Sequence, residues 1–308
     1  MYARLLGYLV LESPGDEGRD YITDEIIRCD SDNDRMNCLA KLYQDHLLRL
    51  FRQNKGHTPT TTPSYDPSLP SVEEEKFLYS SAVEPAPNDH TQAKKAALRR
   101  DDYRCVVTGA LDCDYIECLS PTDQAALPIT VTIRLTNACH IFPPFTNVDI
   151  EPEEEGHPTT HYAGTVWGIV NHFGGVWIEN ELNGNQLHRL SNVMTMTTDL
   201  RTWFDELRLW FEEVPNTPAT YTVGATRLGY LMGVLPVVTF STMDPALALP
   251  DKRYLKLHAV VCRVAWMSGA TKHMDKYDAE HEGETVLAHD GSSAEFLTTK
   301  LQRVLLGA

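Results

Sequence analysis

The 308-residue sequence has no long hydrophobic run. No stretch approaches the roughly 18 consecutive apolar residues that a membrane-spanning helix needs. Residues 1–10 are apolar apart from Arg4, but no charged segment precedes them and no small-residue cleavage site follows them. We therefore expect a folded helix or strand there rather than a signal peptide. We also expect no membrane partner and a location inside the cell, in the cytoplasm or the nucleus.

Positive charge and cysteine are both scarce. Lys and Arg total 27 against 43 Asp and Glu, which gives a formal net charge of −16. Proteins that bind duplex DNA usually present a basic surface, because phosphate neutralisation supplies most of the affinity. The balance therefore disfavours a nucleic-acid partner but leaves room for a local basic site. The cysteines number seven, an odd count scattered along the chain, which indicates reduced thiols rather than a secreted disulfide framework.

What the chain does have is enough apolar character for a substantial core. Hydrophobic residues make up 42% of it, which suffices for one large domain or two small ones. Apolar residues at helical spacing predict helices over 34–53 and 252–268, while the Pro, Thr and Ser of 55–75 predict a linker or a surface loop. We expect four consecutive parts: an N-terminal helical region (1–54), a linker (55–86), a core with an insertion (87–214) and a C-terminal helical region (215–308).

The most basic window is 94–104, with five basic and two acidic residues. It lies on and just beyond a helix predicted over 89–102. A run of this kind is more often a solvated helix face than a binding surface. If it does contact phosphate, the residues available are Lys94, Lys95, Arg99, Arg100 and Arg104.

Four short motifs follow this window in order. The first is Cys-x-x-Thr-Gly, from Cys105 to Gly109, and the second is Cys-His-Ile-Phe-Pro, from Cys139 to Pro143. The third is Asn-x-Met-Thr, beginning at Asn192, and the fourth is Leu-Arg-x-x-Phe-Asp, from Leu200 to Asp205. Their order and spacing are together more specific than any one of them.

The flanking patterns place these motifs on elements of secondary structure. Residues 129–135 alternate as in a strand, so His140 should lie just past a strand end. Apolar spacing over 199–209 predicts a helix that carries the last motif. A strand pair with one histidine, an asparagine in a turn and a residue on a following helix form the minimum set of parts of a one-metal phosphodiesterase.

At these motifs, roughly residues 85–275 resemble the divergent HNH-type nuclease domain found chiefly in fungal proteins. The resemblance implies an α+β fold with a ββα-metal core in a mostly helical surround. It also implies an intracellular endonuclease, a hydrolase that binds DNA and uses one divalent metal ion, Mg²⁺ or Mn²⁺ and alternatively Zn²⁺. His140 is implied as the general base and Asn192 as the residue that orients it. Both are expected in one pocket facing the helix that begins near Asp199.

Two positions depart from that family. Cys139 stands where better-known members have an aspartate ligand, and Arg201 replaces the helix histidine that binds the metal. A thiol is a poor ligand for Mg²⁺, and a guanidinium stays protonated and cannot coordinate a cation. Arg201 takes the third place in the catalytic set in place of that histidine. Asp205 and Asp199 are then the candidate metal ligands, with His188 as a further displaced one.

Several interpretations remain open. The leading one is a nuclease with a degenerate metal site and weak or lost activity. The alternative is a non-catalytic module, derived from an HNH domain, that binds nucleic acid or protein. In a third, Arg201 contacts phosphate directly and turns a cutting cleft into a binding one. The intact His140 and Asn192 favour the enzyme, whereas Arg201 and the net charge favour binding.

Cysteine and histidine also recur away from these positions. His258 and Cys262 stand four apart, a spacing that suits a metal, but a buried pair in a core helix is the simpler interpretation. The cysteines at 105, 113, 118 and 139 could hold zinc, although four ordinary buried thiols fit their loose spacing better.

Overall fold

The computed structural model describes residues 1–52, 87, 89–143 and 158–280. The predicted linker, 55–86, lies outside the described residues. The chain forms two compact units, each assembled from segments far apart in the sequence. The helical unit combines Met1–Arg52, Phe142–Leu187 and Arg253–Ala308, and the mixed unit combines Gln53–Ile141 and His188–Lys252. Four consecutive parts, as expected from the sequence, do not capture this interleaving.

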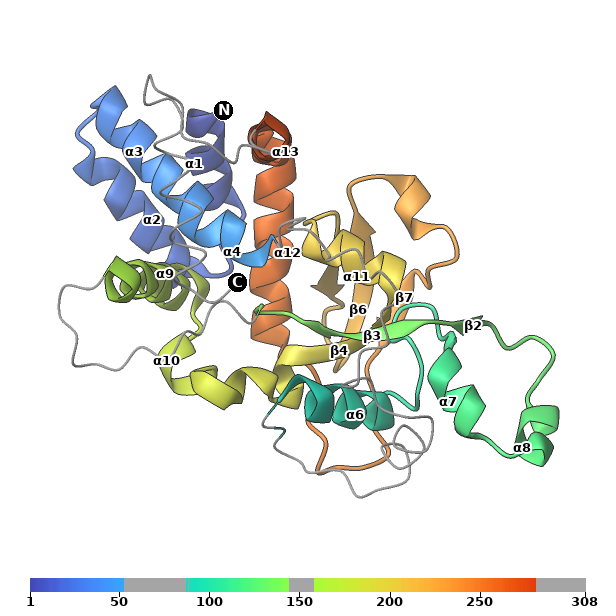
Figure 1. The fold of residues 1–308 in the computed structure, drawn as a ribbon. Coiled ribbons are helices and arrows are strands. Elements are labelled where there is room, and N and C mark those ends of the chain that lie inside the picture. The colour runs from blue at the N-terminus through green and yellow to red at the C-terminus, as the bar shows by residue number, and fades with distance from the viewer. Residues whose placement is uncertain (53–86, 88, 144–157, 281–308) are drawn as a thin grey trace. The chain divides into compact units, whose positions relative to one another are not determined.

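The helical unit confirms the helices expected near the two ends of the described chain (Figure 1). The helix predicted over 34–53 begins after Asp32, whose carboxylate accepts hydrogen bonds from the backbone N–H groups of Asp34 and Arg35. The elements are α1 (Tyr2–Leu11), α2 (Asp16–Arg28), α3 (Asn33–Tyr43), the π-helical turn η1 (Gln44–Leu48), α4 (Arg49–Phe51), α9 (Pro158–Gly174), α10 (Ile178–Glu181), the 3₁₀ helix η3 (Gly184–His188), α12 (Lys252–Ser268) and α13 (Ala270–Glu280).

Close helix packing holds the helical unit together. A Cβ at Gly18 of α2 would lie 2.2 Å from the carbonyl oxygen of Phe173 in α9, so only glycine permits that approach. In α12, His258 and Cys262 are buried, with Sγ 3.6 Å from Nδ1, which confirms them as a core pair. Among the described residues, no helix combines the length and apolar character that crossing a membrane requires.

The mixed unit holds the small sheets, and the chain is α+β as expected. Its elements are α6 (His90–Arg100), β1 (Leu111–Asp112), α7 (Cys113–Cys118), α8 (Pro121–Ala126), β2 (Ile133–Arg134), β3 (Thr136–His140), the 3₁₀ turn η4 (Leu190–Asn192), β4 (Val193–Thr197), α11 (Thr198–Asp205), β5 (Leu209–Glu213), β6 (Thr220–Ala225), η5 (Leu228–Leu231) and β7 (Val237–Thr239).

Two sequence predictions need correction in this unit. The strand expected over 129–135 is confirmed only in β2 (Ile133–Arg134), and the longer strand, β3, begins at Thr136, so His140 is the last residue of a strand rather than just past its end. The region 215–308 is not helical throughout, since β6 and β7 continue an antiparallel sheet from β5 in the order β5-β6-β7. Residues 220–225 alternate Thr, Tyr, Thr and Val, a strand pattern that the expectation of helix overlooked.

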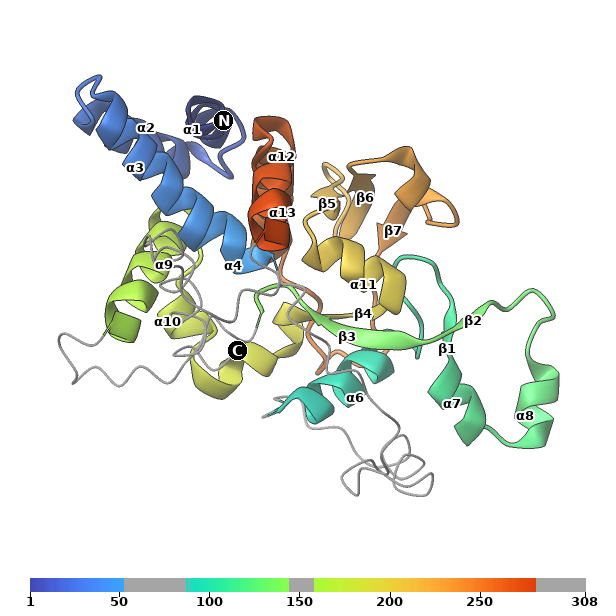
Figure 2. The same cartoon turned by 45° about the horizontal axis from the view of Figure 1, so that its top comes forward.

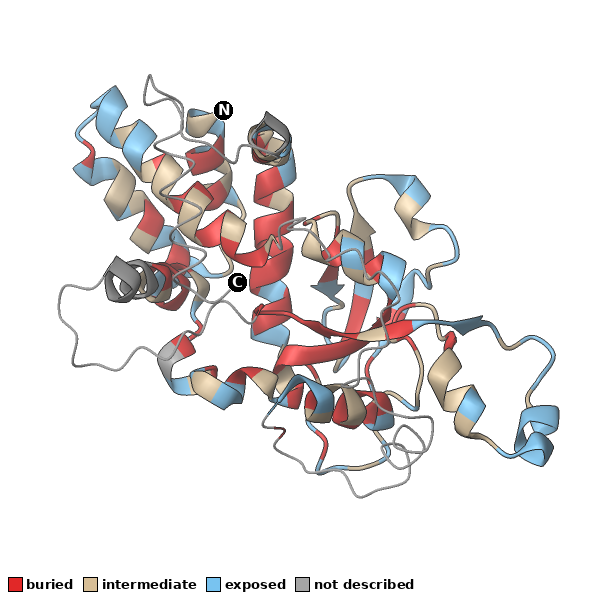
Figure 3. Ribbon diagram, viewed as in Figure 1, coloured by how far each residue is buried: buried red, intermediate tan, exposed pale blue. Residues whose placement is uncertain are grey.

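At the centre of the mixed unit, β3 and β4 form an antiparallel pair, from Thr136 opposite Thr197 to His140 opposite Val193. Helix α6 packs on one face of this pair and α11 on the other (Figures 1 and 2). The contact with α6 is apolar, and both strands are buried, whereas the arm that carries α8 and β2 is largely exposed (Figure 3). The residues of this apolar cluster are Ala93, Ala96, Ala97, Ala138, Leu190, Val193 and Leu247.

Candidate functional site

The first motif forms a turn that is attached to β4. Gly109 donates its N–H to the carbonyl of Cys105 at 2.9 Å, and its φ of +71° lies in the left-handed region that favours glycine. Within the turn, Val106 donates to the carbonyl of Thr195 at 2.9 Å. Cys-x-x-Thr-Gly therefore braces the central strand pair.

His140 ends β3 and lies beside Asn192, as predicted. The residue after the histidine, Ile141, donates its N–H to the carbonyl of Asn192 at 2.8 Å. The side chain of His140 is 4% exposed, and Asn192 is fully buried. The second and third motifs are separated in the sequence by a long insertion. Pairing of β3 with β4 brings them together.

The direction of the His140 ring differs from the prediction. Side chains alternate along β3, so Ala138 and His140 face α6 while Cys139 faces α11. The His140 ring stacks on that of His90, the first residue of α6, with 5.4 Å between ring centres. The expectation that His140 faces the helix after Asp199 is therefore wrong, although Arg201 of α11 is near enough to lower its pKa.

A third histidine completes this cluster. His188, the last residue of η3, places Nδ1 3.2 Å from Nε2 of His140. Burial, followed by the neighbouring His90, His188 and Arg201, lowers the pKa of His140 to about 3. Desolvation also lowers the pKa of His90 and that of His188. All three rings are therefore neutral at pH 7 and keep a nitrogen lone pair.

On the opposite face of the strand pair, Arg201 and Asp205 form the expected pair on α11. The guanidinium Nε lies 3.4 Å from Oδ2 of the carboxylate. Burial raises the pKa of Asp205 to about 6, and Arg201 acts against that rise. The Cys139 thiol lies 3.9 Å from Oδ1 of Asp205, and burial followed by that carboxylate holds its pKa well above the usual value.

These side chains do not fit the hard divalent cation that the family resemblance implies. Cys139 stays a thiol, Asp205 already holds Arg201, and the guanidinium would repel a second positive charge. Asp199 lies exposed in the first turn of α11. Of the metal ligands predicted from the sequence, Asp205 lies beside Cys139, but its carboxylate is already paired with Arg201.

The basic window divides into inward and outward residues. Arg100 is buried, and its five N–H donors bond to the Asp101 carboxylate and to three carbonyls, those of Leu190, Val193 and Ala248. Arg100 is therefore not available to bind phosphate, contrary to the prediction from the sequence. The other four are more accessible. Arg99 is exposed and Lys95 is partly exposed. Lys94 and Arg104 already have partners, since Lys94 Nζ lies 3.6 Å from Oδ2 of Asp114 and Arg104 donates to the carbonyl of Gly109.

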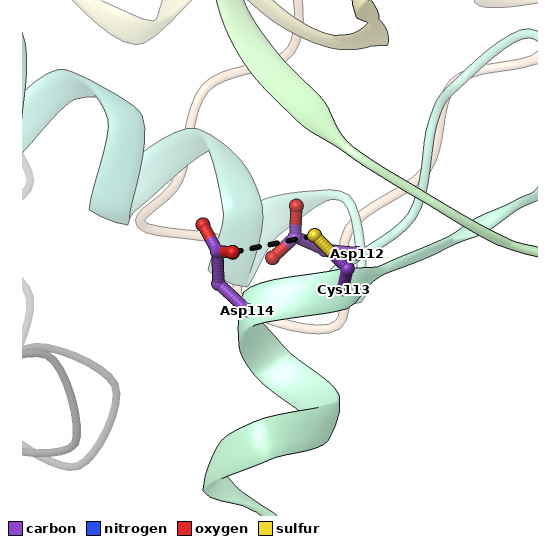
Figure 4. Close-up of side chains that lie close together, drawn as sticks. All are labelled: Asp112, Cys113 and Asp114. Atoms are coloured by element: carbon purple, nitrogen blue, oxygen red, sulfur yellow. Dashed lines mark hydrogen bonds between the residues drawn. The ribbon is translucent and has the colours of Figure 1, made fainter. Parts of the chain in front are cut away.

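One further cluster among the described residues consists of residue types that can bind metal ions. The ligand atoms of Asp112, Cys113 and Asp114 lie within 4.8 Å of one another (Figure 4). Asp112 is buried and accepts hydrogen bonds from Tyr115 and Thr136, which fix the starts of α7 and β3. Burial and the adjacent Asp114 raise the pKa of the Cys113 thiol to about 11. A cation here would have to displace these contacts. The other cysteines of the alternative zinc set, at 105, 118 and 139, do not join Cys113 in this cluster.

Comparison with known families is consistent with this geometry. Residues 105–212 match the family model described as HNH endonuclease. This segment is similar to HNH endonucleases. The match begins at the braced turn, includes β3, β4 and α11, and ends within β5. Comparison with curated proteins and with solved structures gave no match.

Sequence reasoning missed part of this histidine cluster. His90 precedes the matched segment and had no motif to mark it, since it is simply the first residue of a helix. His188 is a candidate displaced metal ligand in the sequence, but its position shortly before Asn192 does not pair it with His140. A cluster that depends on three separate elements has no signature in residue spacing.

Proposed function

We propose that the HNH-type domain hydrolyses phosphodiester bonds in nucleic acid, with DNA as substrate and His140 as the general base. The observation that carries this proposal is the position of His140, a neutral imidazole at the end of β3 beside Asn192, within the segment that matches HNH endonucleases. A neutral imidazole can take a proton from the attacking water, and because its pKa of about 3 makes it a weak base, the reaction is expected to be slow.

Other residues of the domain have supporting roles in this proposal. Asn192 holds the chain after β3 through its carbonyl, which fixes where the histidine emerges. Arg201 is a fixed positive charge close enough to lower the pKa of the base, and it would stabilise charge that develops on the scissile phosphate. Asp205 orients that guanidinium. Because the ligands of a hard cation are altered, we propose that divalent-dependent cleavage is slow.

We propose an intracellular location for this activity. All seven cysteines are free thiols, and Cys38 is exposed, which suits a reducing compartment.

A nicking assay tests the function. Supercoiled plasmid is incubated with the full chain in Mg²⁺, Mn²⁺, Ni²⁺, Zn²⁺ or chelator. We expect slow nicking that His140→Ala abolishes, while His172→Ala, at an exposed histidine of α9, retains it. Absence of nicking under every condition, or nicking that His140→Ala leaves unchanged, would contradict the proposal.

The second candidate is a non-catalytic module that binds nucleic acid or protein. The pairing of Arg201 with Asp205 favours it, because it places a permanent guanidinium where a metal-binding histidine is expected. In this case the protein retains DNA-binding affinity with no cleavage in any metal, and His140→Ala leaves that affinity unchanged.

A further inference from the structure

We propose that His90, His140 and His188 form a nitrogen-ligand site for a borderline divalent transition metal ion of the Zn²⁺, Co²⁺ or Ni²⁺ class. The site lies on the α6 face of the strand pair and draws on three elements: the first turn of α6, the end of β3 and the end of η3. It does not use the altered ligand positions on α11.

The spacing of two ring nitrogens carries the argument. Nε2 of His140 and Nδ1 of His188 lie 3.2 Å apart. Imidazole nitrogens that bind one tetrahedral Zn²⁺ at about 2.0–2.1 Å are themselves about 3.3 Å apart. The same contact is a hydrogen bond when one ring carries its proton on the shared side. Two nitrogens held this close need little rearrangement to share an ion.

His90 supplies the third imidazole. Its ring stacks on that of His140 with 5.4 Å between ring centres, so it would have to turn about its own side-chain bonds to reach a shared ion. It is exposed, and His188 is half-exposed, so an ion can enter from solvent even though His140 is buried. Three imidazoles and no thiolate select a borderline metal over Mg²⁺, which prefers oxygen ligands.

The charges around the cluster act in opposite directions. Arg201 lies close enough to lower the pKa of His90 and of His140, so it would also repel a cation. Asp89, whose charge raises the pKa of His90 and of His188, would attract one. The Arg201 charge is in addition partly compensated by Asp205.

One consequence rests on the proposed function. A neutral imidazole has a single lone pair, and an ion bound to His140 would occupy it. Such an ion therefore inhibits any cleavage in which His140 is the base. Binding itself depends only on the three rings, so it can be tested without activity.

The probe is Co²⁺, added to the chelator-stripped full chain and followed by visible absorption and calorimetry. We expect one Co²⁺ per chain with a spectrum of nitrogen and oxygen ligation. His188→Gln and His90→Gln should each weaken binding by at least about tenfold, the lower end of what even outer-shell changes cost. His90 is exposed and His188 is partly exposed, so both variants should fold, as circular dichroism would verify.

The matched controls are His273→Gln, at an exposed histidine of α13, and Cys113→Ser, which removes the thiol between Asp112 and Asp114. Both should bind Co²⁺ as the unmodified protein does. Unchanged binding in His188→Gln and His90→Gln would overturn the site, as would a thiolate charge-transfer band that Cys113→Ser removes. Nicking in Mg²⁺ without Co²⁺ binding refutes this site alone, and Co²⁺ binding without any nicking refutes only the nuclease.

Discussion

His140 is a buried imidazole that the fold keeps neutral, and this has a consequence for stability. Its pKa in the folded protein is about 3, below the ordinary value of 6.5, so the unfolded chain takes up the proton first. Its contribution to stability is therefore fully present above pH 6.5 and is lost as pH falls from there towards 3. At pH 5 the loss amounts to about 2 kcal/mol for this group.

Urea unfolding at pH 7.5 and pH 5 tests this prediction. The free energy of unfolding should fall on acidification, and His140→Asn should fall less. The exposed His273→Gln serves as the control and should behave as the unmodified protein does. An equal loss in His140→Asn would mean that other groups account for the pH dependence.

Arg201 is the residue that we expect to exclude a hard cation from α11. Two positive charges about 4 Å apart repel by about 4 kcal/mol at an intermediate effective dielectric, enough to empty a weak site. Arg201→His should therefore gain Mn²⁺ binding, measured by water-proton relaxation. Arg201→Gln, which removes the charge without adding a ligand, is the control. The double variant Arg201→His with Asp205→Asn tests the ligand. If it binds Mn²⁺ as well as Arg201→His does, Asp205 is not a ligand.

At the scale of elements, α6 combines a buried and an exposed basic residue in adjacent positions. Arg100 satisfies all five of its donors inside the mixed unit, so Arg100→Gln leaves a buried carboxylate and carbonyls short of partners. We expect it to lower the free energy of unfolding by about 3 kcal/mol or more. The exposed Arg99→Gln should change it by no more than about 0.5 kcal/mol. Equal small effects in denaturant titrations would refute the structural role of Arg100.

The outward face of α6 is the remaining candidate for contact with phosphate. Lys95 and Arg99 are accessible there, whereas Lys94 is already close to Asp114. Lys95→Glu with Arg99→Glu should abolish retention on a DNA column at low salt, because phosphate neutralisation depends on such charges. A charge-matched change away from α6, Lys272→Glu with Lys276→Glu on α13, should have little effect. Unchanged retention in the α6 variant would make this face an ordinary solvated surface.

At the scale of the whole molecule, the three-stranded sheet β5-β6-β7 extends beyond the segment that matches the HNH family, because β6 and β7 follow it in the sequence. Residues 105–212 end within β5, and β6 pairs with β5 so that Leu209 lies opposite Ala225 and Phe211 opposite Val223. A fragment of residues 87–214 should therefore unfold without cooperativity and bind a hydrophobic dye, whereas the full chain unfolds cooperatively. A cooperative transition of that fragment would show that β6 and β7 are dispensable.

Local features follow from the sequence because their causes are local. Asp32 caps a helix through its own neighbours, Gly109 allows a turn that few other residues adopt, and 252–268 is helical from its apolar spacing alone. The order of the four motifs likewise predicted the similarity of residues 105–212 to HNH endonucleases and the closeness of His140 and Asn192.

Only the tertiary structure decided which helix each side chain of the strand pair faces, α6 for His140 and α11 for Cys139. Alternation along β3 shows that Cys139 and His140 point to opposite faces, but not which face α6 covers. The same packing buries Arg100 and brings His90 against His140. These outcomes depend on strand register and on long-range contacts between elements, which residue spacing does not encode.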